Sequence, residues 1–171
     1  MSEEPTPTPP AGDSAAKGGP AAMPMVVNAQ YIKDLSFENP NAPHIFLNAK
    51  EGPQVQLDVN VQVEQVAEHS YEVSLHMETR ATQGADTAFL VDLTYAGVFT
   101  LSNIPAEHRR PLLVIEGARM LFPFARAIIA EVTRDGGFPP LMIHPIDFAE
   151  LYRRQAQAAT GEAPAAPPKP H

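Results

Sequence analysis

Apolar and polar residues alternate along residues 54–101, and this alternation restricts the fold more than any other feature of the chain. Residues 54–66 read QVQLDVNVQVEQV, with Val or Leu at each odd position from 55 to 63 and a polar residue at each even position. The same period continues in residues 71–83 and 87–101, and the Gly-Ala-Asp between them is typical of a hairpin turn. These stretches predict antiparallel strands with one apolar and one polar face.

The stretch QYIKDLSFENPNAPHIF, residues 30–46, contains the end of a first strand that we expect over residues 26–39. Its apolar residues mostly occupy odd positions, which assigns Asp34 and Glu38 to the polar face, with an isolated Ile32 beside them. In the fourth strand, residues 87–101, the same reasoning assigns Leu90 and Asp92 to the polar face, and Gly97 suggests a bulge. If these two strands are neighbours, the five side chains form an acidic patch with an apolar centre. Such a patch is either a solvated surface or a contact for a basic partner.

Residues 111–133 predict a long helix that is apolar over most of its circumference, which is wider than the single stripe of a surface helix. Pro111 suits a first helical position, Pro123 should kink the helix, and Gly136–Gly137 resemble a C-terminal cap. Residues 144–158 predict a second, shorter helix with Asp147 near its N-terminus. One sheet covers only one side of the long helix. We therefore expect an oligomer in which the long helices are sandwiched between sheets of different subunits. The alternative is that the second helix and the tails cover the other side of the long helix.

Length and composition favour one domain. We expect a folded part over residues 26–156, between disordered Pro- and Ala-rich tails at 1–25 and 157–171. A net charge of −8 argues against a nucleic-acid partner. The charge is uneven, because residues 33–100 hold 10 acidic residues against 3 Lys and Arg, a net of −7. The sequence has no cysteine, which fits a reducing compartment. It also has no apolar run of roughly 18 residues and no signal peptide, so we expect a cytoplasmic protein and no membrane span.

The carboxylates and histidines do not form a catalytic motif. Asp34 and Glu38 should lie about 13 Å apart on one strand at about 3.3 Å per residue, whereas a glycosidase pair needs about 5–9.5 Å. The six histidines lack metal-ligand spacing, and no serine lies in a Gly-x-Ser-x-Gly motif. We therefore expect neither an enzyme nor a metal or cofactor site.

Four segments, in order, resemble the SecB family of protein-export chaperones. They are YIKDLSFENPNAPHIF, TAFLVDLTYAGVFTL, LFPFARAII and GGFPPLMIHPIDFAELY. The resemblance covers about residues 27–152. It implies an α+β fold, a four-stranded antiparallel sheet with one long and one shorter C-terminal helix. It also implies a homotetramer, a dimer of dimers with its helices between the sheets.

The resemblance further implies a cytoplasmic chaperone that binds unfolded secretory precursors without ATP and delivers them to the SecA translocase motor. The basic, zinc-bearing C-terminal segment of SecA would dock on Asp34, Glu38, Leu90 and Asp92. Unfolded clients would lie in an apolar groove lined by Phe46, Leu121, Phe124, Phe138 and Leu141. The alternative from the residues alone is a carrier with a pocket for an apolar small molecule between sheet and helix.

Overall fold

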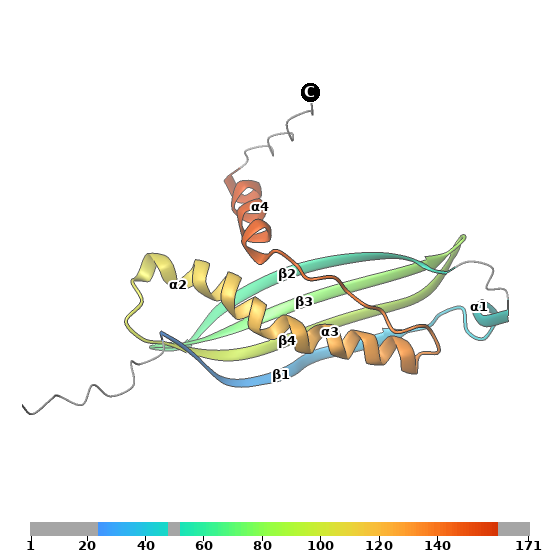
Figure 1. Cartoon of the computed structure of the whole chain (residues 1–171), viewed down its shortest axis with the longest axis horizontal. Helices are drawn as coiled ribbons and strands as arrows, with labels where there is room; N and C mark the ends of the chain where they lie inside the picture. The colour runs from blue at the N-terminus through green and yellow to red at the C-terminus, as the bar shows by residue number, and fades with distance from the viewer. Residues whose placement is uncertain (1–23, 48–51, 161–171) are drawn as a thin grey trace, which may run out of the picture.

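The computed structural model describes residues 24–47 and 52–160, and these form one sheet covered by helices on one face (Figure 1). The strands are β1 (Met25–Glu38), β2 (Gln54–Ala67), β3 (Ser70–Gln83) and β4 (Asp86–Leu101). All neighbouring pairs are antiparallel, in the order β1-β4-β3-β2. The predicted fold class is confirmed, and strands one and four are neighbours.

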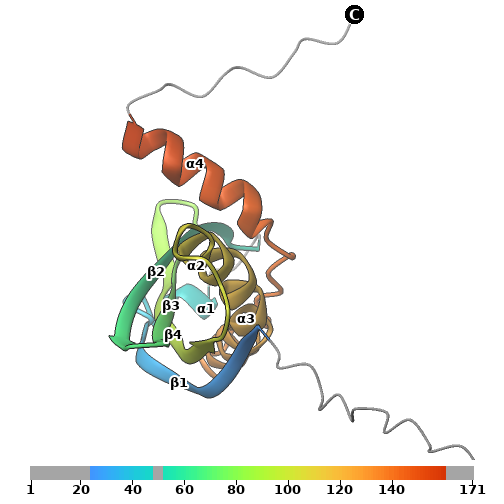
Figure 2. The same ribbon diagram turned by 90° about the vertical axis from the view of Figure 1, so that its left-hand side faces the viewer.

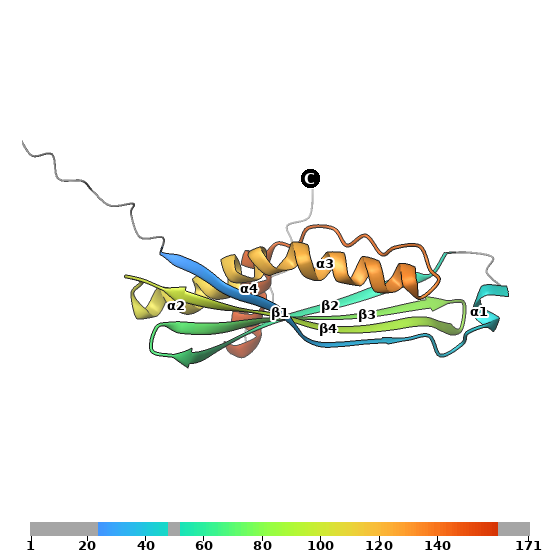
Figure 3. The same cartoon turned by 90° about the horizontal axis from the view of Figure 1, so that it is seen from below.

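A continuous helical stretch lies along the apolar face of the sheet (Figure 3). It consists of α2 (Ala106–Leu112), the π-helical segment η1 (Leu113–Gly117) and α3 (Ala118–Asp135). The core is formed where the odd-numbered residues of β3 and β4 meet this helix. Its fully buried members include Leu75, Leu93, Phe99, Leu113 and Ile129.

The long helix departs from regular α-helix at η1 and not at Pro123, which α3 accommodates within an unbroken helix. The π-helical segment directly follows α2, whose interior contains Pro111. Proline has no N–H to donate to the preceding turn, so a shift in hydrogen-bond spacing next to Pro111 has a physical cause. The helix also begins five residues earlier than expected, at Ala106.

The bulge expected at Gly97 is wrong. Gly97 pairs in regular register with both Gln30 and Val73, and the register shifts nearest to it lie in β1, between Val27 and Ala29 and between Ile32 and Asp34. A glycine is needed at position 97 for another reason. An added Cβ would lie 2.9 Å from Leu121 Cδ2 of α3, so Gly97 allows the helix to approach the sheet.

Helix α4 (Phe148–Thr160) runs past the β2 edge of the sheet (Figure 2), where Gln155 Nε2 donates a 3.1 Å hydrogen bond to Asn60 Oδ1. It begins after Asp147, whose carboxylate accepts hydrogen bonds from the N–H groups of Glu150 and Ala149, both 3.0 Å long. These bonds lower the pKa of Asp147. The helix starts four residues later than expected and continues to Thr160, past the expected boundary at 156, because Ala and Gln are good helix formers. The expected disordered tails fall mainly on residues 1–23 and 161–171, outside the described residues.

A short helix, α1 (His44–Leu47), ends the turn-rich stretch after β1. The sequence predicted only a turn there. Its Ile45 is buried, whereas Phe46 remains 43% exposed.

Candidate functional site

The outer face of the sheet is the polar face turned away from α3. Residues directly opposite each other in an antiparallel pair share one face. Glu38 pairs with Leu90, Ser36 with Asp92 and Asp34 with Thr94, so the structure places Asp34, Glu38, Leu90 and Asp92 together on adjoining strands. Asp34 and Glu38 are exposed, while Leu90 and Asp92 are partly covered.

This outer face is strongly acidic across all four strands. The register places two carboxylates each on β1, β2 and β3 and one on β4, seven in all, against the two cations Lys33 and Arg80. The β4 carboxylate on this face, Asp92, lies 2.8 Å from His76 Nε2. Within the described residues, no ion pair involves Asp34 or Glu38. The surface can therefore attract a cationic partner through unpaired carboxylates.

Ile32 does not belong to this outer face, contrary to the sequence prediction. It pairs with Tyr95, whose side chain faces α3, whereas Tyr31 pairs with Ala96 on the outer side. The extra residue at the second register shift, Lys33, reverses the alternation of β1 before Asp34. Leu90 therefore lies among carboxylates without Ile32 beside it.

A separate network on the outer face joins β1 to β3 across β4. The Tyr31 hydroxyl and the Lys33 ammonium donate to the two oxygens of Glu72, and the Ser74 hydroxyl donates to Glu72 at 3.0 Å. The bond to Glu72 raises the pKa of Tyr31 to about 12. The hydrogen bonds from Lys33 and Tyr31 lower the pKa of Glu72. Glu72 is thus neutralised locally and contributes little to the unpaired charge of the face.

Aromatic side chains gather where α1 meets the end of α3. The ring of Phe138 lies 5.1 Å from that of Phe46 and 4.9 Å from that of Phe89, and Phe89 stacks on Phe37 at 6.0 Å. Phe138 is buried, so of the expected groove residues at this end only Phe46 presents much of its ring to solvent. Each such aromatic pair contributes about 0.5–1.5 kcal/mol beyond burial.

Gly136 and Gly137 make room for these rings in addition to ending α3. Gly137 has φ +90°, a left-handed conformation that suits glycine after a helix, so the expected C-terminal cap is confirmed. A Cβ at Gly136 would lie 2.1 Å from Phe37 Cζ, and one at Gly137 would lie 3.0 Å from Phe46 Cζ. The sequence reasoning assigned the two glycines to the cap alone.

The expected groove residues on α3 differ in exposure. Leu121 is fully buried against the sheet, so within this chain its side chain cannot line a groove. Phe124 is 52% exposed and stacks on Tyr95 with ring centroids 6.2 Å apart. Both rings border an open hollow of about 380 Å³ between α3 and β1, lined also by Val27, Asn28, Ala29 and Gln30. Sequence reasoning treated Tyr95 as core and missed this hollow.

The connection between α3 and α4, residues 136–147, packs against the end of α3. Leu141 N–H donates a 3.0 Å hydrogen bond to the buried Thr133 hydroxyl, which itself donates to Ile129 O at 2.9 Å. Leu141 is partly buried, Ile143 is buried, and Met142 points outward with 71% exposure. The apolar connection therefore has one face on the core and one toward solvent.

An apolar stripe remains exposed along α3, away from the sheet. Met120, Pro123, Phe124 and Ala127 follow helical spacing and are all exposed. The helix is thus apolar on two sides. In the described part of the chain, only the side that faces the sheet is covered. None of the described helices is long and apolar enough to cross a membrane. Among the described residues, no group of three or more His, Asp and Glu could hold a metal ion.

Comparison with known proteins gives a consistent result. Residues 19–159 match the family model of SecB, the preprotein translocase subunit. The chain is 52% identical over 136 residues to the protein-export protein SecB of Rhodospirillum centenum, covering 79% of this chain and 81% of the relative. It is 49% identical to that of Rhodopseudomonas palustris, covering 85% and 95%, and 48% identical to that of Rhodospirillum rubrum, covering 90% and 95%.

A solved structure shares the fold at low sequence identity. It is a SecB-like chaperone of Mycobacterium tuberculosis in complex with a peptide from an antitoxin. The TM-score is 0.61 with 16% identity, over 71% of this chain and 90% of the other.

Proposed function

This chain belongs to the SecB family, and on that premise we propose that it is a chaperone for protein export that keeps unfolded precursor proteins competent for translocation. The observation that carries the proposal is the identity of about half of all residues to SecB proteins over most of both chains. We further propose that it works in the cytoplasm, without ATP and without catalysing a reaction. Neither the relatives nor the open hollow beside Phe124 supports the alternative of a small-molecule carrier.

The surface suits the binding of unfolded chains. An unfolded precursor exposes apolar side chains, and Phe46, Phe124 and Met142 offer it apolar area that is not buried in this chain. Contacts spread over several such sites give avidity with little sequence specificity. We assign Phe46, Phe124, Phe138 and Leu141 to the client groove and leave out the buried Leu121.

A denatured precursor carrying its signal sequence tests this function. The purified protein should bind the unfolded precursor in the absence of ATP, suppress its aggregation, and ignore the folded mature form. Replacement of Phe124 by Asp should weaken client binding, because it places a charge on the apolar surface, while light scattering on the same variant checks that its assembly is unchanged. Equal binding of folded and unfolded protein, or binding of neither, contradicts the proposal.

We also propose that the exposed stripe of α3, apart from Phe124, is covered by other copies of the chain in a homotetramer built as a dimer of dimers. The stripe is apolar, and the described part of the chain supplies no cover for it. Four chains of 18.5 kDa give a mass of about 74 kDa. Light scattering measures this mass directly, and a stable monomer would contradict the sandwich of helices between sheets.

The acidic outer face is the proposed docking surface for the basic, zinc-bearing C-terminal segment of SecA. Supporting this, Asp34, Glu38, Leu90 and Asp92 share one face of two adjoining strands, and Asp34 and Glu38 have no ion-pair partner among the described residues. Exposed charge pairs contribute about 0.2–1 kcal/mol each. Three carboxylates therefore account for about 0.6–3 kcal/mol, which is an affinity change of about 3-fold to 150-fold.

The triple variant Asp34→Asn, Glu38→Gln and Asp92→Asn tests this docking surface by titration with the zinc-loaded segment. Its affinity should fall within that range, and the loss should shrink as salt screens the charges. Glu64→Gln, a carboxylate on the same face of β2, is the control and should change affinity much less. An unchanged affinity of the triple variant would remove these residues from the mechanism.

A further inference from the structure

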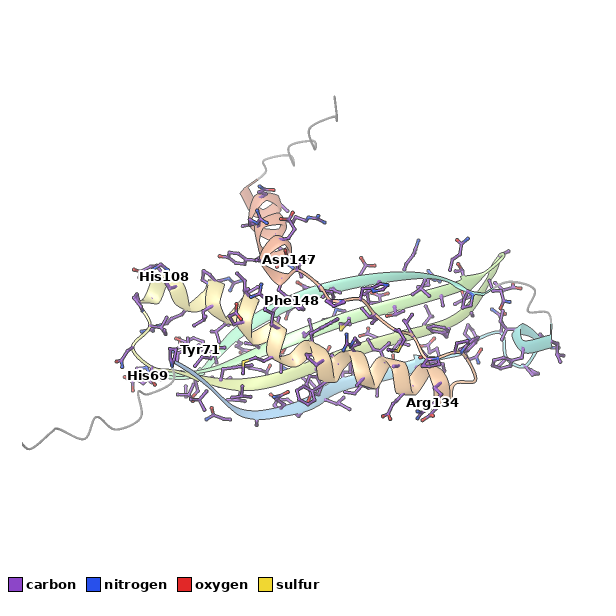
Figure 4. The ribbon with its side chains drawn as sticks, in the orientation of Figure 1. His69, Tyr71, His108, Arg134, Asp147 and Phe148 are labelled. Atoms are coloured by element: carbon purple, nitrogen blue, oxygen red, sulfur yellow. The ribbon has the colours of Figure 1, made fainter. Side chains whose placement is uncertain are left out.

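A second hollow, of about 340 Å³, lies between α2 and the end of the sheet. Its lining is Val63, Gln65, Tyr71, Ala106, Arg109, Arg110 and Leu113. It is located at the opposite end of the sheet from α1 and the aromatic cluster, near the labelled Tyr71 and His108 (Figure 4). The proposed client groove and docking surface do not use it.

The hollow combines an apolar floor with two arginines that have no acidic partner in the part of the chain that the structure describes. Arg109 is fixed, because its Nε donates to Ile104 O at 2.9 Å and its Nη1 to the Tyr71 hydroxyl at 3.4 Å. Arg110 is exposed beside it. Within residues 24–47 and 52–160, neither guanidinium forms an ion pair with a carboxylate. Such a hollow is complementary to a segment with acidic and apolar side chains.

The N-terminal part of the chain joins the sheet at this same end. Met25 pairs with Leu101, and Pro24 O accepts a 3.0 Å hydrogen bond from Ser102 N–H. Leu101 N–H donates to His69 O at 3.0 Å, just before β3. Only β4 separates β1 from β3, so Pro24 lies about 10–15 Å from the hollow at the strand spacing of about 4.8 Å.

The first thirteen residues carry the acidic and apolar side chains that would complement the arginines and the apolar floor of the hollow. They read MSEEPTPTPPAGD and contain Glu3, Glu4 and Asp13 but no Lys or Arg side chain. They also lie outside the match to the SecB family, which begins at residue 19. The ten residues 14–23 can span up to about 33 Å when extended, which exceeds the distance to the hollow.

We propose that residues 1–13 bind in this hollow of their own chain. The glutamates pair with Arg109 and Arg110, and the prolines pack on the apolar floor at Val63 and Tyr71. A tether of this length gives an effective concentration in the millimolar range, so a weak contact suffices and an acidic segment of another protein is at a disadvantage. Proline-rich segments are already extended, so little chain entropy is lost on binding.

The absence of cysteine allows a direct test on the full chain. A nitroxide attached to Ala11→Cys should broaden the methyl signals of Val63 and Leu113 in nuclear magnetic resonance spectra. Arg110→Glu should abolish the broadening, and the added pair Glu3→Lys and Glu4→Lys should restore it. Arg110 is chosen because Arg109 also holds Ile104. The control is a nitroxide at Ala163→Cys in the other tail, which should leave both signals sharp.

The outcomes separate this proposal from its alternatives. Absent broadening, or broadening that survives Arg110→Glu, overturns it. A mixture of spin-labelled chains with isotope-labelled chains that carry no nitroxide identifies the source of the segment. If signals of the isotope-labelled chains broaden in that mixture, the occupant comes from a neighbouring copy and binding within one chain is refuted.

Discussion

Replacement of Thr133 by Val should loosen the connection between α3 and α4. The Thr133 side chain is fully buried, and its hydroxyl is the acceptor for Leu141 N–H at 3.0 Å. Val keeps the shape and removes the acceptor, so the backbone N–H of a partly buried residue loses its partner. An unmade hydrogen bond of this kind costs about 1–3 kcal/mol. We expect the free energy of unfolding to fall by that amount.

Thr79→Val is the matched comparison, and its effect should have the opposite sign. Thr79 is also fully buried, but its hydroxyl has no hydrogen-bond partner among the described residues. Val removes a buried polar group that was never satisfied and restores an apolar contact in β3, which should stabilise the protein by about 1 kcal/mol. The two variants change the same atom in the same residue type, so only the surroundings of the hydroxyl differ.

Urea unfolding followed by circular dichroism measures both effects, because the chain has no Trp to serve as a fluorescent probe. Protein concentration must be held constant, since assembly contributes to apparent stability. Thr133→Val should also speed hydrogen exchange at Leu141, whereas Thr79→Val should leave it unchanged. Equal stability changes in both variants would refute the reasoning that hydrogen-bond satisfaction determines the sign.

Two further predictions concern the outer network and the end of α3. One of the four tyrosines should titrate near pH 12 by ultraviolet absorbance, because Tyr31 donates to Glu72, and Glu72→Gln should bring its pKa back toward 10. The stabilisation from the raised pKa is present below pH 10 and is lost between pH 10 and about 12. Gly136→Ala should destabilise the protein by about 1–3 kcal/mol, because the new Cβ would lie 2.1 Å from the Phe37 ring. Gly52→Ala, where a Cβ meets nothing within 4 Å, is the control and should change stability by less than about 0.5 kcal/mol.

The sequence predicted the faces of β2, β3 and β4 correctly over most of their length, because register shifts interrupt their alternation only near strand ends, at Val66 and Ala88. The buried row Val73, Leu75 and Met77 follows this alternation. It failed for β1, where the extra residue at Lys33 reverses the faces and moves Ile32 to the helix side. A bulge in an edge strand leaves no clear signal in a single sequence, because the register is set by the partner strand.

The acidic outer face was predictable in part, because alternation is regular on both strands where its residues lie. Asp34, Glu38, Leu90 and Asp92 lie beyond the reversal, so simple alternation assigns them to one face. Burial on α3 was less predictable, because an all-round apolar helix gives no indication of which side the sheet covers. Leu121, expected to line the client groove, is fully buried in this chain. The hollow beside Arg109 and Arg110 was also out of reach, since it depends on how α2 lies over the ends of β2 and β3.

Hydrogen exchange of a bound precursor, read by mass spectrometry, tests the central claim most directly. The precursor is offered unfolded and without ATP, and the exchange of its own amides is measured in the complex. The account predicts a stable complex in which most client amides exchange nearly as fast as in the unfolded chain, with slowed exchange only in apolar segments. A client that acquires the protection pattern of its folded form, or that aggregates at the same rate as without the protein, would contradict a chaperone that holds precursors unfolded.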